Sequence, residues 1–366
     1  MGHVTAPRYL YEAAPLNVYW EVTRACDLAC QHCRADAMPQ RHPLELTTEE
    51  GQALLRDVCT LGSHLILTGG DPMQRDDLFA LIAYGRRLGL TISITPSTTP
   101  RLTRAAVHRF RELGVATMGV SLDGPTPEAH DAFRGVPGTF AVSVQALRWA
   151  REARLPVQVN TTVTKETLAH LPALYRRLRE EAAPPVRRWS LFLLVPVGRG
   201  ALLQSPTAEE VEALFAWVYA IAAEAPFHVS TVEAPHFRRY WIEQQLAAGV
   251  APEAILQRGR SRGFGIRDGN GVIFVSHTGD VYPAGFLPFP WLGNVRERPL
   301  SEIYRTSPRL QALRDMDRLQ GKCGQCAFRW ICGGSRARAY ALTGDPMASD
   351  PFCLYHPAPG APVWGA

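Results

Sequence analysis

The 366-residue chain contains almost no lysine, because Lys165 and Lys322 are the only lysines among its 39 Lys and Arg residues. Arginine binds carboxylates and phosphates through a planar, two-pronged guanidinium, so the composition is compatible with an anionic substrate. A GC-rich genome produces the same abundance of Arg, Ala and Pro without functional meaning. The net charge is only +5, and no basic run carries interleaved aromatic side chains, so we expect no nucleic-acid partner.

Long apolar runs are also absent. No stretch of about 18 apolar residues could form a transmembrane helix. The first residues, MGHVTAPRYLYEAAPLN, lack the basic and apolar regions of a secretory signal. We therefore expect a cytoplasmic protein that does not bind membranes. With 46% hydrophobic residues, the chain can form one large α/β domain with an appendage.

Cysteine is missing between Cys59 and Cys323, so that seven of the eight cysteines fall into two groups. Such groups indicate metal binding in a large cytosolic protein, whereas they indicate disulfides in a small secreted one. Cys59 stands alone in the apolar stretch LLRDVCTL, and we interpret it as a small buried hydrophobe.

The first group is CDLACQHC, in which Cys26, Cys30 and Cys33 have C-x3-C-x2-C spacing. A [4Fe–4S] cluster normally has four cysteine ligands. Three cysteines without a nearby fourth therefore predict a cluster whose open iron binds a small molecule. A structural zinc site is the alternative, but it needs four ligands, and His32 is the only spare one nearby.

The second group has C-x2-C-x5-C spacing, with a fourth cysteine after twenty intervening residues. Its members are Cys323, Cys326, Cys332 and Cys353. Four thiolates complete a site with no open coordination position, as in an auxiliary [4Fe–4S] cluster. Zinc is again the alternative, since C-x2-C pairs bind it equally well.

From Leu16 to about Val195, short apolar or β-branched runs alternate with amphipathic stretches of helical length, which predicts βα units on a parallel sheet. The predicted strands are residues 17–23, 64–68, 91–95, 117–121, 156–164 and 188–195. Six units are too few to close an eight-stranded barrel. We therefore expect an α/β protein with a partial (β/α)6 TIM-like barrel, whose chemistry lies at the C-terminal strand ends.

The remainder of the chain has a different pattern. Residues 201–262 are predicted to be mostly helical, with interruptions at Pro226 and Pro235. Residues 269–285 predict a hairpin whose turn contains HTGD, followed by a short helix and the second cysteine group. We expect a cysteine-rich α+β domain in this region.

Two further motifs lie after predicted strands. Gly69-Gly70-Asp71-Pro72 follows the second strand, where glycines allow the backbone to approach a ligand closely. The fourth strand ends in SLDG, and HDAFRGVPGTF follows it. Together with C-x3-C-x2-C, these motifs resemble those of the radical S-adenosylmethionine superfamily. The second cysteine group is similar to those of its SPASM and twitch extensions.

This resemblance implies roles for individual residues. The Gly69–Pro72 turn would hold the methionine amino group of S-adenosylmethionine, with Asp71 where Glu is commoner. Ser121 and Arg134 would bind the methionine carboxylate, and other polar residues at strand ends would contact the ribose, although such residues also act as caps. The cofactor-contact candidates are His32 (near the adenine), Gly69, Gly70, Asp71, Pro72, Thr95, Ser97, Ser121, Arg134 and Asn160.

The resemblance also implies a domain organisation. It consists of an N-terminal extension (1–15), a radical S-adenosylmethionine partial barrel (16–205), a helical bridge (206–262) and a SPASM/twitch-like auxiliary-cluster domain (263–366). Ala284 and Arg336 stand where the full seven-cysteine SPASM pattern has cysteines. We therefore expect one auxiliary cluster instead of two.

The implied reaction is reductive cleavage of S-adenosylmethionine to methionine and a 5′-deoxyadenosyl radical, which abstracts a hydrogen atom from the substrate. The nearest subgroups are those of the alternative haem synthase, of haem d1 biosynthesis and of peptide maturases. The substrate would be a tetrapyrrole whose propionate is oxidatively decarboxylated, or alternatively a ribosomally made peptide. The electron donor would be a flavodoxin or ferredoxin. A non-catalytic iron–sulfur electron carrier and a zinc-stabilised scaffold remain as alternatives.

Candidates for substrate chemistry lie in the bridge, where Glu233, His236 and Tyr240 bring together an acid, an imidazole and a phenol. A solvated helix start explains the same residues. We expect both cysteine groups to face one cavity lined by this part of the bridge. Three arginines, Arg199, Arg336 and Arg338, are candidates to meet an anionic group near the auxiliary cluster.

Overall fold

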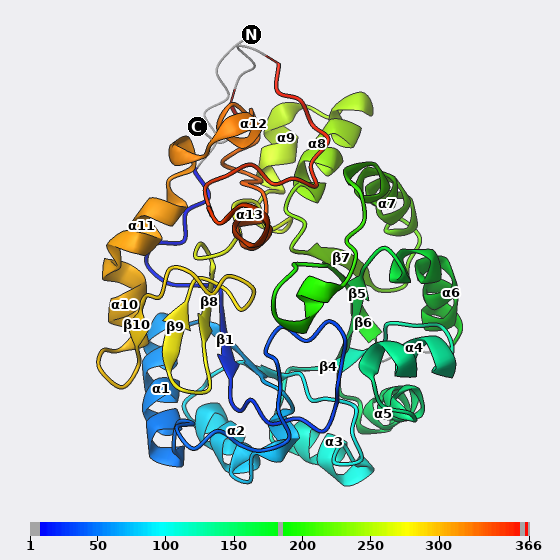
Figure 1. Ribbon diagram of the computed structural model, residues 1–366, viewed down its shortest axis with the longest axis vertical. Coiled ribbons are helices and arrows are strands. Elements are labelled where there is room, and N and C mark those ends of the chain that lie inside the picture. The colour runs from blue at the N-terminus through cyan, green and yellow to red at the C-terminus, as the bar shows by residue number, and fades with distance from the viewer. Residues whose placement is uncertain (1–7, 182–185, 359–362, 365–366) are drawn as a thin grey trace.

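The computed structural model of the protein describes residues 8–181, 186–358 and 363–364. Within these ranges the strands form one open sheet in the order β10-β9-β8-β1-β2-β3-β4-β5-β6-β7 (Figure 1). The strands are β1 (Asn17–Glu21), β2 (His64–Thr68), β3 (Ile92–Ile94), β4 (Thr117–Ser121), β5 (Val157–Val163), β6 (Val186–Leu193), β7 (His228–Val232), β8 (Val272–Val275), β9 (Asp280–Tyr282) and β10 (Gly293–Asn294). The expected α/β partial barrel is confirmed.

The barrel part has one parallel strand more than the sequence pattern indicates. β1 to β6 are the predicted strands, and each pairs in parallel with the next one along the chain. β7 then pairs in parallel with β6, although its sequence HVSTV lies in the segment expected to be mostly helical. Its β-branched residues favour an extended strand, and Pro226 separates it from the preceding helix.

The outer side of the barrel is covered by amphipathic helices, which lie around the rim of the sheet in Figure 1. These helices are α1 (Thr48–Leu61), α2 (Leu78–Arg87), α3 (Arg104–Glu112), α4 (Pro127–Arg134), α5 (Thr139–Ala153), α6 (Leu171–Glu181) and α7 (Ala208–Ile221). Their apolar faces and the outward-facing strand residues form the main core, which includes Trp20, Phe110, Trp189 and Phe215. Cys59 packs against this core but is only partly buried, and its Sγ donates to the Leu88 carbonyl at 3.2 Å.

The inner side of the barrel is more polar than the outer side. Along β5, Val157, Val159 and Val163 are buried, whereas the alternating Asn160 and Thr162 are partly exposed. A parallel strand covered on both faces is normally apolar throughout. The polar inner face therefore lines a space that the helices do not fill.

The C-terminal part extends the same sheet. The predicted hairpin is present as antiparallel β8 and β9, and β8 pairs in parallel with β1. The other elements are α8 (Phe237–Ala247), α9 (Pro252–Gln257), α10 (Leu300–Thr306), α11 (Pro308–Arg314), α12 (Gly321–Gly324), α13 (Arg336–Thr343) and the short 3-10 helices η1 (Pro72–Gln74), η2 (Thr167–His170), η3 (Gly198–Leu202) and η4 (Met316–Arg318). The sheet thus runs through both expected boundaries, at residues 205 and 262.

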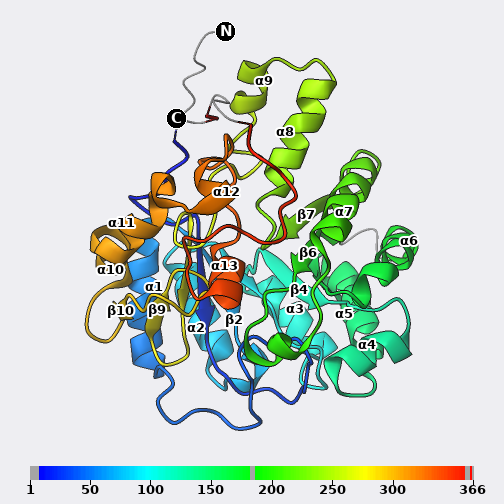
Figure 2. The same cartoon turned by 45° about the horizontal axis from the view of Figure 1, so that its top comes forward.

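Helices α8, α9 and α12 lie together at one end of the molecule (Figure 2). Tyr9 belongs to their apolar cluster and donates a hydrogen bond to the Leu256 carbonyl at 2.9 Å. Residues 1–7 of the expected N-terminal extension lie outside the described residues. No helix in the described ranges combines the length and apolarity needed to cross a membrane.

Candidate functional site

The first cysteine group lies in the loop after β1, at the C-terminal ends of the parallel strands. Cys26, Cys30 and Cys33 line a cavity of about 180 Å³. The other walls come from the ends of β2, β5 and β6, and from Phe286 beyond the hairpin. This is the position at which parallel barrels carry their chemistry.

Glycines allow two turns to press against the cysteine loop. A Cβ on Gly70 would lie 2.4 Å from the Ala25 carbonyl oxygen, and one on Gly198 would lie 2.5 Å from that of Cys33. Gly198 also has a φ of +53°, which L-residues with side chains rarely adopt. The Gly69-Gly70 turn and the turn after β6 thus hold the loop from two sides.

Every sulfur of the first group lies near an N–H donor. The Sγ atoms of Cys26, Cys30 and Cys33 accept from Leu28 N at 3.4 Å, Arg134 Nη1 at 3.8 Å and Ala37 N at 3.5 Å, respectively. Hydrogen bonds of this type stabilise cluster thiolates and tune their reduction potential. The loop is therefore suited to an iron–sulfur cluster.

Arg134, a predicted carboxylate contact, lines the cavity but is already engaged. Its Nε and Nη2 donate to Asp123 Oδ2 at 2.8 and 2.5 Å. Burial alone raises the pKa of Asp123, but Arg134 outweighs burial and holds that pKa below its usual range. Asp123 Oδ1 also accepts from Thr162 N at 2.7 Å. The carboxylate of Asp123 in the SLDG motif therefore orients Arg134. The spacing of the motifs in the sequence could not show this pairing.

Asp71 uses its carboxylate within the protein. It is fully buried and accepts from Met73 N at 3.0 Å, Ser97 N at 3.2 Å and Thr99 Oγ1 at 2.9 Å. Ser97 in turn donates to the Gly70 carbonyl at 2.9 Å. Asp71 thus fixes the Gly69–Pro72 turn, while Gly69, Gly70 and Ser97 line the cavity.

The other predicted contacts divide into two sets. His32 lines the cavity, and its ring stacks on Phe133 with 4.5 Å between centroids. Thr95, Ser121 and Asn160 lie at or just beyond the ends of inner strands, where Ser121 and Asn160 are register partners on β4 and β5. None of these three residues lines the cavity in the described structure, and neither does Pro72.

Two further arginines of the cavity wall are Arg34, in the cysteine loop, and Arg199, in the turn after β6 that packs against this loop. Arg199 donates from Nε to the Cys30 carbonyl at 2.8 Å and from Nη1 to that of Ala37 at 3.2 Å, while its buried Nη2 has no partner. Arg199 therefore lies at the first cysteine group, and its expected place near the second group stays a prediction. The neighbouring Gly198 could have indicated this position in the sequence, because a glycine allows the turn after β6 to approach the cysteine loop closely.

Arg34, directly after Cys33, connects the cysteine loop to the C-terminal part. It donates to Glu21 Oε2 at 2.8 Å, and its guanidinium lies 4.7 Å above the Phe274 ring of β8. His277 of the hairpin turn is within 2.7 Å of the other Glu21 oxygen. Burial raises the pKa of Glu21, but Arg34 and His277 outweigh it and keep the pKa below its ordinary value.

The cysteines of the second group lie near one another, although no three of them in the described ranges converge closely enough to hold a metal ion. Its sulfurs accept from backbone amides, with Cys323 bound by Asp350 N at 3.5 Å, Cys326 by Phe328 N at 3.4 Å and Cys332 by Gly334 N at 3.4 Å. Burial raises the pKa of Cys332 most, and the nearby Cys353 and Cys326 raise it further. The four thiols therefore share one neighbourhood, with the amide donors expected of a cluster site.

Two of the three bridge candidates, Glu233 and His236, contact the segment that carries the second group, through Ser335 and Asp350. Glu233 has a φ of +54° and accepts from Ser335 Oγ at 2.6 Å. His236 is 1% exposed, and burial lowers its pKa to about 3. Tyr240 packs in an aromatic cluster with Phe237.

Neither the bridge candidates nor the C-terminal cysteines line the cavity of the first group among the described residues. The expected common cavity is therefore not seen there, and a catalytic role of Glu233, His236 and Tyr240 stays a prediction. The two remaining arginines do lie in the second group's domain. Arg338 is fully buried and bound to Asp350 by two bonds of 2.9 Å, and Arg336 donates to backbone carbonyls.

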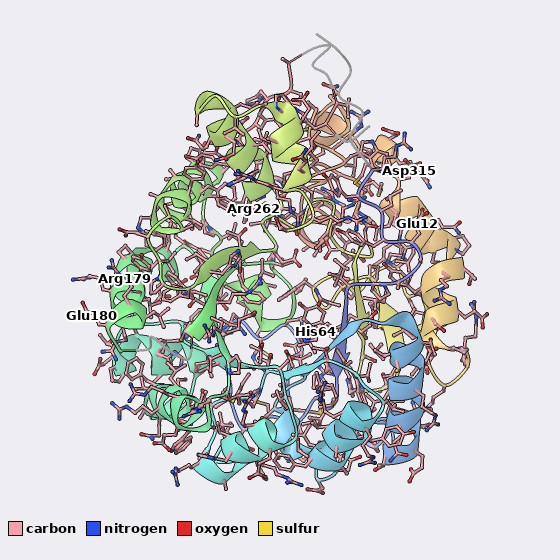
Figure 3. The ribbon with its side chains drawn as sticks, turned by 180° about the vertical axis from the view of Figure 1, so that it is seen from behind. Glu12, His64, Arg179, Glu180, Arg262 and Asp315 are labelled. Atoms are coloured by element: carbon pink, nitrogen blue, oxygen red, sulfur yellow. The ribbon has the colours of Figure 1, made fainter. Side chains whose placement is uncertain are left out.

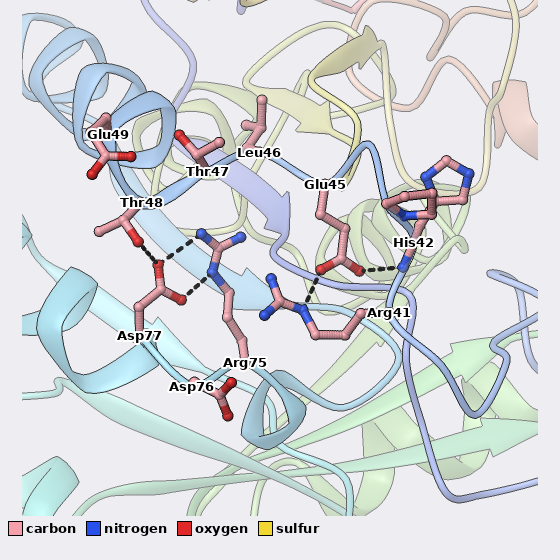
Figure 4. A pocket seen from close by; sticks show the side chains of 11 residues that line it. Arg41, His42, Glu45, Leu46, Thr47, Thr48, Glu49, Arg75, Asp76 and Asp77 are labelled. Atoms are coloured by element: carbon pink, nitrogen blue, oxygen red, sulfur yellow. Dashed lines mark hydrogen bonds and ion pairs between the residues drawn. The ribbon is translucent and has the colours of Figure 1, made fainter.

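A larger and more open pocket of about 520 Å³ lies beside the start of α1 (Figure 4). Its arginines are neutralised within the pocket, Arg41 by Glu45 at 2.7 Å and Arg75 by Asp77 at 2.6 Å. Among the described residues, no strand end and no cysteine lines it. We therefore place the functional site at the smaller cavity.

Comparisons with known proteins agree with this site. The model of the Radical SAM superfamily matches residues 20–178, and that of the SPASM iron–sulfur cluster-binding domain matches residues 267–327. The chain belongs to the radical SAM superfamily. It is a radical SAM enzyme that uses S-adenosylmethionine, a [4Fe–4S] cluster and an auxiliary iron–sulfur cluster.

Curated relatives match along almost the whole chain. The AdoMet-dependent heme synthases of Oleidesulfovibrio alaskensis and Nitratidesulfovibrio vulgaris are each 39% identical over 97% of this chain, and over 92% and 98% of their own lengths. The PqqA peptide cyclase of Rhodopseudomonas palustris is 29% identical over 94% of this chain and 88% of its own length.

Solved structures share the fold. SuiB of Streptococcus suis superposes with a TM-score of 0.74 at 18% identity, over 95% of this chain and 77% of that one. The AdoMet-bound anSMEcpe superposes with a TM-score of 0.68 at 17% identity, over 93% and 94% of the two chains.

Proposed function

We propose that the protein is an S-adenosylmethionine-dependent haem synthase, which converts propionate side chains of an iron porphyrin to vinyl groups by oxidative decarboxylation. The observation that carries this proposal is the 39% identity to two heme synthases over nearly their entire lengths. The peptide cyclases are less similar, at 29% identity or below. Modification of a peptide is therefore the second candidate.

We assign the catalytic cluster to Cys26, Cys30 and Cys33 and the auxiliary cluster to Cys323, Cys326, Cys332 and Cys353. When bound, the catalytic cluster and S-adenosylmethionine supply the 5′-deoxyadenosyl radical. The protein's own residues position these groups: Gly69 and Gly70 keep the turn free of side chains, and Asp123 aims Arg134 at the cavity. His32 and Phe133 form a flat wall on which an adenine can stack.

The charges of the cavity favour a carboxylate. Arg34 and Arg134 are neutralised by Glu21 and Asp123. Arg199 has no carboxylate partner in the described structure, and its buried Nη2 is free to donate. A buried guanidinium N–H without a partner costs free energy unless an acceptor arrives, so Arg199 is our candidate for holding an anionic group in this cavity.

The experiment uses anaerobically reconstituted protein with dithionite, S-adenosylmethionine and Fe-coproporphyrin III, the product named for a Methanosarcina barkeri relative that is 33% identical over 92% of this chain. We expect haem with one 5′-deoxyadenosine formed per vinyl group, measured by chromatography and mass spectrometry. Cys30→Ala should abolish cleavage of S-adenosylmethionine, whereas Cys332→Ala should retain cleavage and lose haem formation. Unchanged Fe-coproporphyrin III alongside active cleavage would contradict the substrate and favour a peptide.

Arg199 has its own test. Arg199→Lys keeps the charge but loses the planar fork, and Arg199→Gln loses both. We expect the KM for the porphyrin to rise more in the Gln variant than in the Lys variant. Equal KM values in both variants and the wild type would remove Arg199 from carboxylate binding. We further propose a cytoplasmic location and an acidic electron donor of the flavodoxin or ferredoxin class.

A further inference from the structure

An arginine-rich turn follows helix α9. Its sequence, QRGRSRG at residues 257–263, contains Arg258, Arg260 and Arg262, and all three are exposed. No ion pair involves any of them in the part of the chain that the structure describes. Arg262 lies 4.6 Å above the Trp241 ring. Burial lowers the pKa of Arg262, and Arg258 lowers it further, so like charges lie close together here.

The basic surface continues onto the edge of the sheet. Arg188 near the start of β6 is exposed and is the register partner of His228 on β7. Burial lowers the pKa of His228, and both Arg188 and Arg262 lower it further, so both arginines lie near this histidine. We call Arg188, Arg258, Arg260 and Arg262 the arginine surface. Arg262 is labelled in Figure 3, which shows the molecule from behind.

Several exposed arginines elsewhere in the chain do have acidic partners. Arg104 is 2.7 Å from Glu152, and Arg296 is 2.6 Å from Glu50. A cluster of four like charges without such partners raises the free energy of the folded protein. An acidic partner molecule would offset this repulsion, and its association would be accelerated by the same field.

The turn packs directly onto the second cysteine group. Gly265 N donates to the Ile331 carbonyl at 2.9 Å, and Arg238 Nη1 donates to the same carbonyl at 3.1 Å. Phe264, which directly follows the turn, and Cys332 belong to one apolar cluster. Three of the four cysteines of this group, Cys323, Cys326 and Cys353, are partly exposed, whereas in the first group only Cys33 is. The second group is thus the more accessible one from outside.

The arginine surface is distant from the catalytic cavity. Arg188 lies near the N-terminal end of β6, and Leu193 at the other end of this strand lines the cavity. At about 3.3 Å per residue, the strand separates them by roughly 16 Å. A protein bound at the arginine surface would therefore serve the second cysteine group.

We propose that the arginine surface binds an acidic one-electron carrier protein that exchanges electrons with the auxiliary cluster. This inference rests on the proposed function. After hydrogen abstraction, the substrate radical R–CH•–CH2–COO⁻ loses CO2 and one electron and becomes R–CH=CH2. An oxidised ferredoxin-class carrier accepts that electron by way of the auxiliary cluster and is reduced by one electron.

Binding to the complete enzyme is tested first. An acidic plant-type [2Fe–2S] ferredoxin is immobilised, and anaerobic holoenzyme is passed over it at several salt concentrations. We expect Arg258→Gln/Arg260→Gln/Arg262→Gln to lower the association rate about tenfold or more and to flatten its salt dependence. The control Arg111→Gln/Arg148→Gln/Arg151→Gln removes the same charge from exposed positions on α3 and α5 and should behave like the wild type. Equal weakening by both variants, or by neither, overturns the proposal.

Electron exchange is tested in Cys26→Ala/Cys30→Ala/Cys33→Ala protein, which keeps only the second cysteine group. Mixing its dithionite-reduced, desalted form with oxidised ferredoxin should bleach the ferredoxin absorbance, more slowly when the three turn arginines are Gln. Absence of exchange, or exchange at equal rates, contradicts the proposal. Iron content and melting temperature verify that each variant is folded.

A porphyrin titration distinguishes this proposal from the alternative that the arginine surface binds the substrate. If the three Gln substitutions weaken Fe-coproporphyrin III binding and leave ferredoxin binding intact, the surface belongs to the substrate and our assignment is wrong. Neither binding assay requires haem formation. Arginine-dependent ferredoxin binding without haem formation would therefore contradict the proposed function alone.

Discussion

Removing the carboxylate of Asp123 should destabilise the protein strongly even before any cofactor binds. The side chain is 1% exposed, and Arg134 donates to its Oδ2 at 2.8 and 2.5 Å. Asp123→Ala leaves the Arg134 guanidinium buried without its counter-ion and leaves Thr162 N without its acceptor. Breaking a buried ion pair from one side costs about 3–5 kcal/mol. At about 2 °C per kcal/mol for a chain of this size, the melting temperature should fall by roughly 6–10 °C.

Two further variants separate this effect from loss of function. In Asp123→Leu/Arg134→Leu both charges are gone, so much of the stability should return, whereas binding of S-adenosylmethionine should remain weak because Arg134 lines the cavity. Glu112→Ala, which removes the exposed partner of Arg109, is the control and should shift the melting temperature by less than about 2 °C. The assays are anaerobic scanning calorimetry at one scan rate and titration calorimetry with S-adenosylmethionine. A melting temperature of Asp123→Ala within 2 °C of the wild type would refute the reasoning.

Further predictions concern pH, a glycine and a buried acid. Burial lowers the pKa of His130 to about 4 and that of His236 to about 3, so below about pH 6.5 the unfolded chain binds more protons than the folded one. Stability therefore decreases as the pH is lowered. The two histidines should cost about 3 kcal/mol by pH 5.5, seen in urea titrations, and an unchanged slope in His236→Gln would contradict this. Gly198→Ala forces a Cβ to within 2.5 Å of the Cys33 carbonyl and should reduce iron binding by about half, from about eight iron per chain for two clusters; full iron content would show that the loop adapts. Asp71→Ala leaves two amides and a hydroxyl without their acceptor and should cost at least about 1–3 kcal/mol; a neutral result in the same urea titration would show that water replaces the carboxylate.

The sequence by itself determined the chemistry that depends on local spacing. Three cysteines within eight residues can share one cluster whatever the rest of the chain does, and Gly69-Gly70 directly after a strand forms a turn without side chains. The alternation of apolar strands with amphipathic helices likewise indicated the partial barrel, since strand and helix have different periods. These features need only neighbours in the chain, and the structure and the family relationship agree with them.

Only the tertiary structure decided which distant residues meet. β7 is five residues long and lies between helices, so its strand character depends on pairing with β6. The pairing of β8 with β1 follows from the path of the chain around the barrel. Arg199 contacts the cysteine loop because Gly198 permits a close turn. Gly198 lies 165 residues beyond Cys33, so only the folded chain brings the two segments together.

The same limit applies to charge. A sequence shows that arginines are abundant, but not which of them have partners. Arg134 is neutralised by Asp123, Arg34 by Glu21 and Arg338 by Asp350, whereas the arginines of the turn after α9 are not neutralised in the described structure. Whether a guanidinium supports the fold or is free to bind another molecule depends on distances of a few ångströms between distant segments, because Coulomb energy and desolvation both change steeply over that range.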